Sequence, residues 1–237
     1  MTEPARVTGA VPGRSHVWLW LALALLAGVY VRALAFTPVE RVQGLAQKIF
    51  YIHVPSAWAA FLAFIVVSAC SVGYLVLKDQ RLDLIAASSA EVGVVFTSGV
   101  LLTGPIWAKP IWGAWWTWDA RLTSTLFLWF IFFGYLVMRS AVGEPGQRAR
   151  YSSVLGILGA PLVVFIHVSV TLFRTTHPQP VVLKPQGPTL PGEMLTTLLL
   201  SVAVFTVFYL ALTARRYALA KAELARAQAL AEGDHAA

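Results

Sequence analysis

The chain has 237 residues, of which 58% are hydrophobic and only 12% are charged, and its formal net charge is +7. Soluble domains usually carry about 25% charged residues, so this composition excludes a soluble enzyme, a disordered chain and a secreted disulfide scaffold. A single cysteine, Cys70, excludes an internal disulfide, a CxxC redox pair and a cysteine-rich zinc site.

Six apolar stretches qualify as helices that cross a bilayer core about 30 Å thick, for which roughly 20 residues are needed. Their approximate ranges are 17–36, 55–77, 84–103, 123–138, 154–173 and 194–214. We therefore predict an all-α integral membrane protein in which residues 1–214 form a single six-helix domain. The Ala-rich segment 215–237, which also carries Lys and Arg, is expected to continue the last span as a helical cytoplasmic tail.

The first stretch has a second interpretation as a cleavable signal peptide, because Arg6 and Arg14 precede an apolar run that ends at residues 33–35. The run is longer than most signal-peptide cores, however, and Arg32 lies where a cleavage region should be uncharged. We therefore favour a retained transmembrane helix.

Basic residues orient the six spans, which place both termini on the same side. That side carries most of the Lys and Arg residues that lie outside the spans: Arg6, Arg14, Lys78, Arg81, Arg139, Arg148, Arg150, Arg215, Arg216, Lys221 and Arg226. The opposite side carries fewer: Arg41, Lys48, Lys109, Arg121, Arg174 and Lys184. Because positive residues accumulate in the cytoplasm, we predict cytoplasmic termini and outward-facing loops between spans 1 and 2, 3 and 4, and 5 and 6. No RNA-type aromatic module accompanies these charges, so nucleic acid is not an expected partner.

The loop between spans 3 and 4 concentrates five of the nine tryptophans within twelve residues. They are Trp107, Trp112, Trp115, Trp116 and Trp118. One or two tryptophans at a helix end are typical of the aromatic belt at a membrane interface. Five of them, interleaved with Lys109, Asp119 and Arg121, exceed what anchoring requires.

If the segment after Pro110 is helical, these side chains form a flat aromatic surface, which we call the shelf. Positions i, i+3, i+4 and i+7 share one helix face, and here they are Trp112, Trp115, Trp116 and Asp119. Gly113 would keep the neighbouring backbone low. Because indoles offer flat apolar faces and one N–H donor each, such a shelf suits a planar, mostly apolar ligand with a polar edge.

The run Trp-Gly-x-Trp-Trp-x-Trp-Asp-x-Arg-Leu-Thr-Ser at residues 112–124 resembles the "WWD" signature of haem-handling membrane proteins. Within that group the chain resembles the cytochrome c maturation protein C (haem exporter protein C) family over essentially its whole length. The similarity rests on six spans, on the signature between spans 3 and 4, and on a histidine in each flanking outward loop. It implies that the tryptophans, with Gly113 and Asp119, form a platform for non-covalent haem b.

Two histidines match the axial ligands of that family. His53 stands just before Pro55, where we predict that span 2 begins, and His177 follows span 5. An isolated loop histidine is most often a solvated residue, but imidazole is also a standard axial ligand of haem iron. The resemblance assigns the iron to His53 and His177. His167, inside span 5, is the competing candidate, and we interpret it as a packing or supporting residue that could pair with Ser169 or Glu91.

Charged residues near the shelf admit more than one role. Arg121 and Lys109 are candidates for the haem propionates, because guanidinium groups bind carboxylates with two hydrogen bonds. An equally good alternative is that Arg121 pairs with Asp119 or extends to the lipid headgroups. Asp119 itself is expected to cap span 4, to orient an indole or to pair with Arg121. Glu91, inside span 3, must be neutralised, paired or water-facing, and the sequence does not select among these.

The resemblance implies a haem delivery protein of the bacterial inner membrane rather than an enzyme. It would hold haem on the periplasmic face and pass it to a membrane-anchored haem chaperone, beside the ATP-binding and membrane subunits of an ABC transporter and a small single-span subunit. No Walker A sequence is present in this chain, so it lacks P-loop chemistry of its own. Three alternatives stay open: a haem lyase acting directly on apocytochrome c, a channel or transporter with only an aromatic belt, and a purely structural subunit of the ABC complex.

Overall fold

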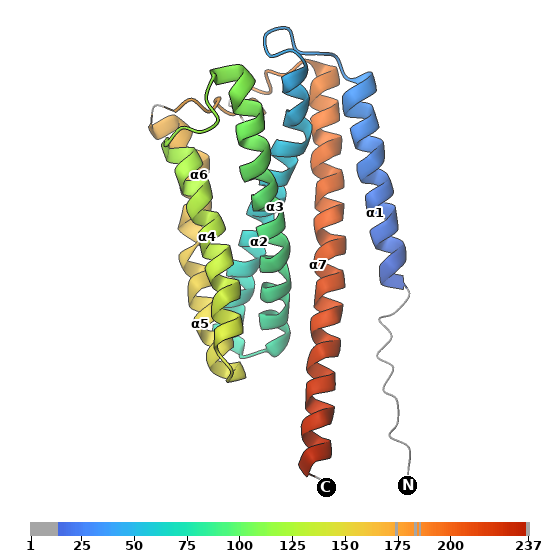
Figure 1. Ribbon diagram of the computed structural model, residues 1–237, viewed down its shortest axis with the longest axis vertical. Coiled ribbons are helices and arrows are strands. Elements are labelled where there is room, and N and C mark those ends of the chain that lie inside the picture. The colour runs from blue at the N-terminus through green and yellow to red at the C-terminus, as the bar shows by residue number, and fades with distance from the viewer. Residues whose placement is uncertain (1–13, 174, 183, 185, 236–237) are drawn as a thin grey trace.

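A computed structural model describes residues 14–173, 175–182, 184 and 186–235 (Figure 1). Arg6 and Arg174, which contribute to the predicted charge asymmetry, lie outside these residues. The described part contains no β-strand, and six of its helical segments are long and apolar enough to cross a membrane. This confirms the predicted all-α, six-helix membrane architecture.

The elements follow one another in this order: α1 (Arg14–Val31), a π-helical turn (Arg32–Phe36), a 3₁₀ turn (Leu45–Ile49), α2 (Phe50–Leu77), α3 (Gln80–Trp112), α4 (Ala120–Ala141), α5 (Pro145–Leu158), α6 (Ala160–Leu172) and α7 (Gly192–His235). Figure 1 shows α2 and α3 in the middle of the bundle, with α1 and α7 on one side and α4, α5 and α6 on the other. α7 projects beyond the other helices at the end where the chain finishes, which we call the tail end. The segments 37–49, 113–119, 175–182 and 186–191 meet at the opposite end, the loop end.

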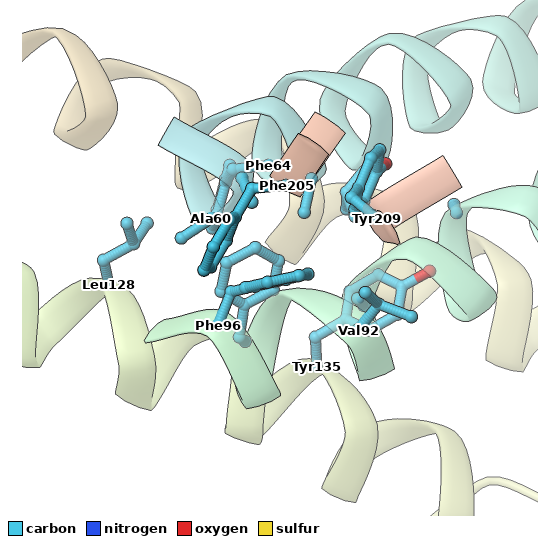
Figure 2. Close-up of a cluster of buried hydrophobic side chains, with 14 of the residues drawn as sticks. Ala60, Phe64, Val92, Phe96, Leu128, Tyr135, Phe205 and Tyr209 are labelled. Carbon is cyan, nitrogen blue, oxygen red and sulfur yellow. The ribbon is translucent and has the colours of Figure 1, made fainter. Parts of the chain in front are cut away.

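Aromatic side chains fill the centre of the bundle, where α2, α3, α4 and α7 meet (Figure 2). The rings of Phe64 and Phe132 lie 4.4 Å apart between centroids. Phe64 also fits against the bend between α5 and α6, where a Cβ added to Gly159 would lie only 1.8 Å from its ring. The fifth span is therefore two helices joined at a residue that leaves room for a core aromatic.

The helices extend beyond the predicted spans at the loop end. α2 begins at Phe50, because Phe50 and Tyr51 are buried in a small apolar cluster with Leu198 and continue the helix upstream of Pro55. The prediction that His53 precedes this helix is therefore wrong: His53 lies in its first turn and is buried. Pro55 therefore lies inside the helix, where it removes one backbone donor without ending the helix.

The predicted helix through the tryptophan-rich segment is also wrong. α3 runs on to Trp112 and ends at Gly113, whose φ of +76° is the left-handed conformation that commonly terminates helices. The next helix begins only at Ala120, after the Asp119 carboxylate accepts a hydrogen bond from the backbone N–H of Leu122 at 2.9 Å. Residues 113–119 are therefore a non-helical connection, and their side chains share no helix face.

Two carboxylates inside the spans have arginine partners. Asp83 of α3 forms a two-pronged ion pair with Arg139 of α4, at 2.5 and 2.9 Å; the Asp83 side chain is buried and that of Arg139 is largely buried. Glu91 of α3 pairs with Arg216 of α7 at 2.5 Å, which selects the paired alternative for this residue. His167 is therefore not the partner of Glu91.

Candidate functional site

Two adjoining hollows open at the loop end. The first, of about 150 Å³, lies among α2, α3 and α4, and the residues that matter at its border are His53, Trp107, Trp112, Trp116, Arg121 and His177. The second, of about 290 Å³, lies among α2, α6, α7 and the segment that follows His177, and is bordered by Trp58, Phe61, Arg121, His167, His177 and Leu198. The structure thus brings His53 and His177 to one cavity, on the same side of the bundle.

The His53 ring is held in a defined orientation by α3. Its Nδ1 lies 2.9 Å from the hydroxyl of Thr103, and that hydroxyl donates its proton to the carbonyl of Gly99 at 2.7 Å. Thr103 must therefore accept from His53, so Nδ1 carries the proton and Nε2 keeps a free lone pair. Gly104 permits the close approach, because a Cβ there would lie 3.3 Å from the imidazole. Fixing one ring nitrogen in this way is how proteins orient metal-binding histidines.

His177 is arranged in the same manner on the segment after α6. Its Nδ1 lies 3.0 Å from the carbonyl oxygen of Pro178, which can only accept, so Nδ1 is again protonated and Nε2 is free. Burial lowers the pKa of His177 to about 4, and the positive charge of Arg121 acts in the same direction. At neutral pH the ring is therefore uncharged and its Nε2 is available as a ligand.

Asp119 ties the tryptophan-rich segment to the segment that carries His177. Besides capping α4, its carboxylate accepts hydrogen bonds from the hydroxyls of Thr175 at 2.7 Å, Thr176 at 3.0 Å and Thr117 at 3.3 Å. The Thr175 hydroxyl in turn accepts from the backbone N–H of His177 at 3.0 Å. Burial raises the pKa of Asp119, but these hydrogen bonds outweigh it and hold the pKa below its usual range. Asp119 is therefore an ionised anchor for the His177 backbone.

The five tryptophans divide into two groups. Trp107, Trp112 and Trp116 border the first hollow, and the Trp116 indole nitrogen is buried without a hydrogen-bond partner in the described part of the chain. Trp115 and Trp118 lie outside both hollows and are 58% and 77% exposed. The predicted platform is therefore not one continuous shelf, and Gly113 serves instead to end α3.

The two candidate cations also separate. Arg121, in the first turn of α4, borders both hollows and makes no direct ion pair with Asp119 among the described residues. Lys109 donates to the carbonyl of Gly113 at 2.9 Å and borders neither hollow. Of the two, only Arg121 is placed to meet a negatively charged group on a ligand in the cavity.

Several residues that shape the site were not predicted. Thr103 orients His53, Thr175 and Thr176 connect His177 to Asp119, and Gln43 accepts from the Trp107 indole at 3.0 Å. The adjacency of Thr175 and Thr176 to His177 was the one visible signal. Thr103 and Gln43 act across distances of 50 and 64 residues, which periodicity does not reveal.

Comparisons with known proteins identify the family of this chain. A family model described as "Heme exporter protein C" matches residues 1–231. The chain is 36% identical to the Heme exporter protein C of Bradyrhizobium diazoefficiens over 90% of this chain and 80% of that protein. It is 34% identical to the protein of the same name from Haemophilus influenzae, over 86% of this chain and 82% of that protein. A Marchantia polymorpha protein named as a putative cytochrome c biosynthesis ccmC-like mitochondrial protein is 34% identical over 79% of this chain and 77% of its own length. The chain belongs to the heme exporter protein C family.

Proposed function

We propose that this membrane protein handles haem for cytochrome c biogenesis and binds one haem non-covalently at the loop end. The names of its relatives support this role, since they refer to haem export and to cytochrome c biosynthesis. The observation that carries the proposal is that His53 and His177 border one hollow, each with Nδ1 engaged and Nε2 free. Two such imidazoles can take the two axial positions of one iron.

The remaining parts of the first hollow fit a porphyrin. Trp107, Trp112 and Trp116 supply apolar aromatic surface, and the unpartnered Trp116 N–H is a donor that a ligand would satisfy. Arg121 supplies positive charge for a propionate. Pockets that enclose a drug-sized ligand usually measure about 300–1,000 Å³, so a hollow of about 150 Å³ would enclose only part of a haem and leave the rest exposed.

An exposed edge suits delivery to another protein. We propose that the acceptor is a membrane-anchored haem chaperone, and that the exposed Trp115 and Trp118 lie on the surface it approaches, because large exposed apolar side chains mark interaction sites. The charge distribution supports a periplasmic loop end and cytoplasmic termini in the bacterial inner membrane. There the chain would work with the subunits of an ABC transporter and a small single-span subunit, and without enzymatic chemistry of its own.

Absorption spectroscopy of the purified full chain tests the haem site. We expect a low-spin spectrum in the parent and its loss in H53A and in H177A, because either variant leaves the iron with one imidazole. H16A, altered in the first turn of α1 at the tail end, is the matched control and should keep the parent spectrum. Unchanged low-spin spectra in both H53A and H177A would overturn the proposal.

Delivery requires a second measurement, because haem binding alone does not distinguish a carrier from a direct lyase. Haem-loaded protein is mixed separately with a purified membrane-anchored haem chaperone and with an apocytochrome c. We expect the pigment to move to the chaperone. Transfer to the apocytochrome alone would support the lyase alternative.

A further inference from the structure

Three histidines are distributed over the two hollows in an ordered way. His53 borders the first hollow only, His167 borders the second only, and His177 borders both. Arg121 also borders both hollows. A group in the second hollow therefore lies next to the same imidazole and the same guanidinium as a group in the first.

The second hollow extends along the membrane-spanning helices. His167 precedes the last residue of α6 by five positions, or about 7.5 Å at 1.5 Å per residue, and Trp58 lies eight residues into α2, or about 12 Å. Between them the border is mainly apolar, with Val54, Phe61 and Leu198. The second hollow therefore suits an apolar ligand that lies within the hydrocarbon region of the bilayer.

His167 is unusual for a residue in this position. It is exposed on a helix that crosses the membrane, and its ring makes no hydrogen bond within the described part of the chain. An ionisable side chain inside a span is costly unless it is paired or takes part in function. Glu91, its predicted partner, is paired with Arg216, and the Ser169 hydroxyl donates to the backbone of Ile166. The ring is therefore left to face the second hollow.

We propose that the second hollow is a receiving site for haem that arrives laterally from the lipid, with His167 as its iron ligand. This inference rests on the proposed function. In this inference the Nε2 of His177, which borders both hollows, engages the iron only in the first hollow, so haem in the second hollow has His167 as its single imidazole ligand and is high-spin. On moving to the first hollow the bond from iron to His167 breaks and bonds to His53 and His177 form, with no electron or proton transferred. Arg121 can hold a propionate throughout, because it reaches both hollows.

Haem uptake from vesicles tests the receiving site. The full chain, in lipid nanodiscs, is mixed with phosphatidylcholine vesicles that carry haem, and the spectrum is followed over time. We expect a high-spin species in the parent, followed by the low-spin product. H167A should lose the early species and form the product at least about tenfold more slowly, with an unchanged final spectrum.

Two further variants separate coordination from polarity and packing. H167Q keeps a polar side chain without an imidazole and should be as slow as H167A. V164A, an exposed position one turn earlier on α6 that borders neither hollow, should behave as the parent. Parent-like uptake by H167A, or recovery of the rate by H167Q, would overturn the inference.

A double variant identifies the ligand of the early species. H53A should stop at the high-spin stage, and H53A combined with H167A should hold much less haem. If the double variant retains as much high-spin haem as H53A, the iron is on His177 and the receiving site does not exist. The outcome is separable from the proposed function, which fails if the parent never forms the low-spin product or if both H53A and H177A keep it.

Discussion

The two ends of the bundle differ in whether their charged and ligating groups have partners within the protein. Toward the tail end, Asp83 and Arg139 are buried together, and Glu91 is paired with Arg216. At the loop end, Arg121 has no direct carboxylate partner in the described chain, and two imidazoles keep a free nitrogen. The two carboxylates toward the tail end thus have arginine partners within the protein, whereas the loop end keeps a guanidinium and two imidazole nitrogens that a ligand of the proposed kind could use.

The largest expected effect comes from breaking the buried pair. D83A leaves the Arg139 guanidinium buried without its carboxylate, which typically costs about 3–5 kcal/mol. E223A removes only the exposed and longer contact to Arg216 at 3.4 Å and should cost less than about 1 kcal/mol. Unfolding in detergent micelles measures both. If D83A lost no more unfolding free energy than E223A, the Asp83 pair would not stabilise the fold. The amount of haem bound per folded molecule should stay unchanged in both variants.

Asp119 should affect both stability and ligand binding. D119A removes the cap of α4 and the acceptor that holds Thr175, and with it the His177 backbone. We expect haem affinity to fall about 10–100-fold, as for other residues that orient metal ligands. D79A is the matched control, because Asp79 caps α3 at the tail end in the same way. Titration with haem should show normal affinity in D79A, although both variants lose about 0.5–2 kcal/mol of stability.

The response to acid should report the environment of His177. Protons compete with iron for its Nε2, and the pKa of about 4 means that this competition begins well below the usual range of histidine. The low-spin spectrum should therefore persist at pH 5, and its loss should begin only at about pH 4 or below, because iron binding opposes protonation of Nε2. R121Q removes the nearby positive charge and should move the loss to higher pH. A midpoint near 6.5 in the parent would contradict this account.

The smallest effects should distinguish the two groups of tryptophans. W116A removes aromatic surface and a donor from the first hollow, and we expect a loss of about 0.5–1.5 kcal/mol in haem binding. W118A, outside both hollows, should leave haem affinity within about twofold. Equilibrium titration resolves the two. A larger loss in W118A would restore the idea of one continuous shelf.

The sequence predicts the bundle well because the bilayer imposes the length and the apolar character of each span. It also offers a helix cap as one of the roles of Asp119, because a cap depends on neighbours along the chain, whereas His53 and His177 become candidates through the family resemblance. It fails between Trp112 and Asp119, where helical spacing suggested a shared face but the backbone of Gly113 turns to positive φ. Local pattern does not reveal that His53 meets Thr103, or that Asp119 meets Thr175, because these contacts depend on how the helices pack.

Four donors converge on the Asp119 carboxylate, and this arrangement has a consequence for repeated use of the site. This carboxylate, which borders neither hollow, holds three parts of the protein by hydrogen bonds: the start of α4, Thr117 and the segment that precedes His177. Under the proposed function, haem can therefore bind and leave without breaking these hydrogen bonds. The residues around the hollow then keep their positions, so that rebinding requires little rearrangement of the polypeptide.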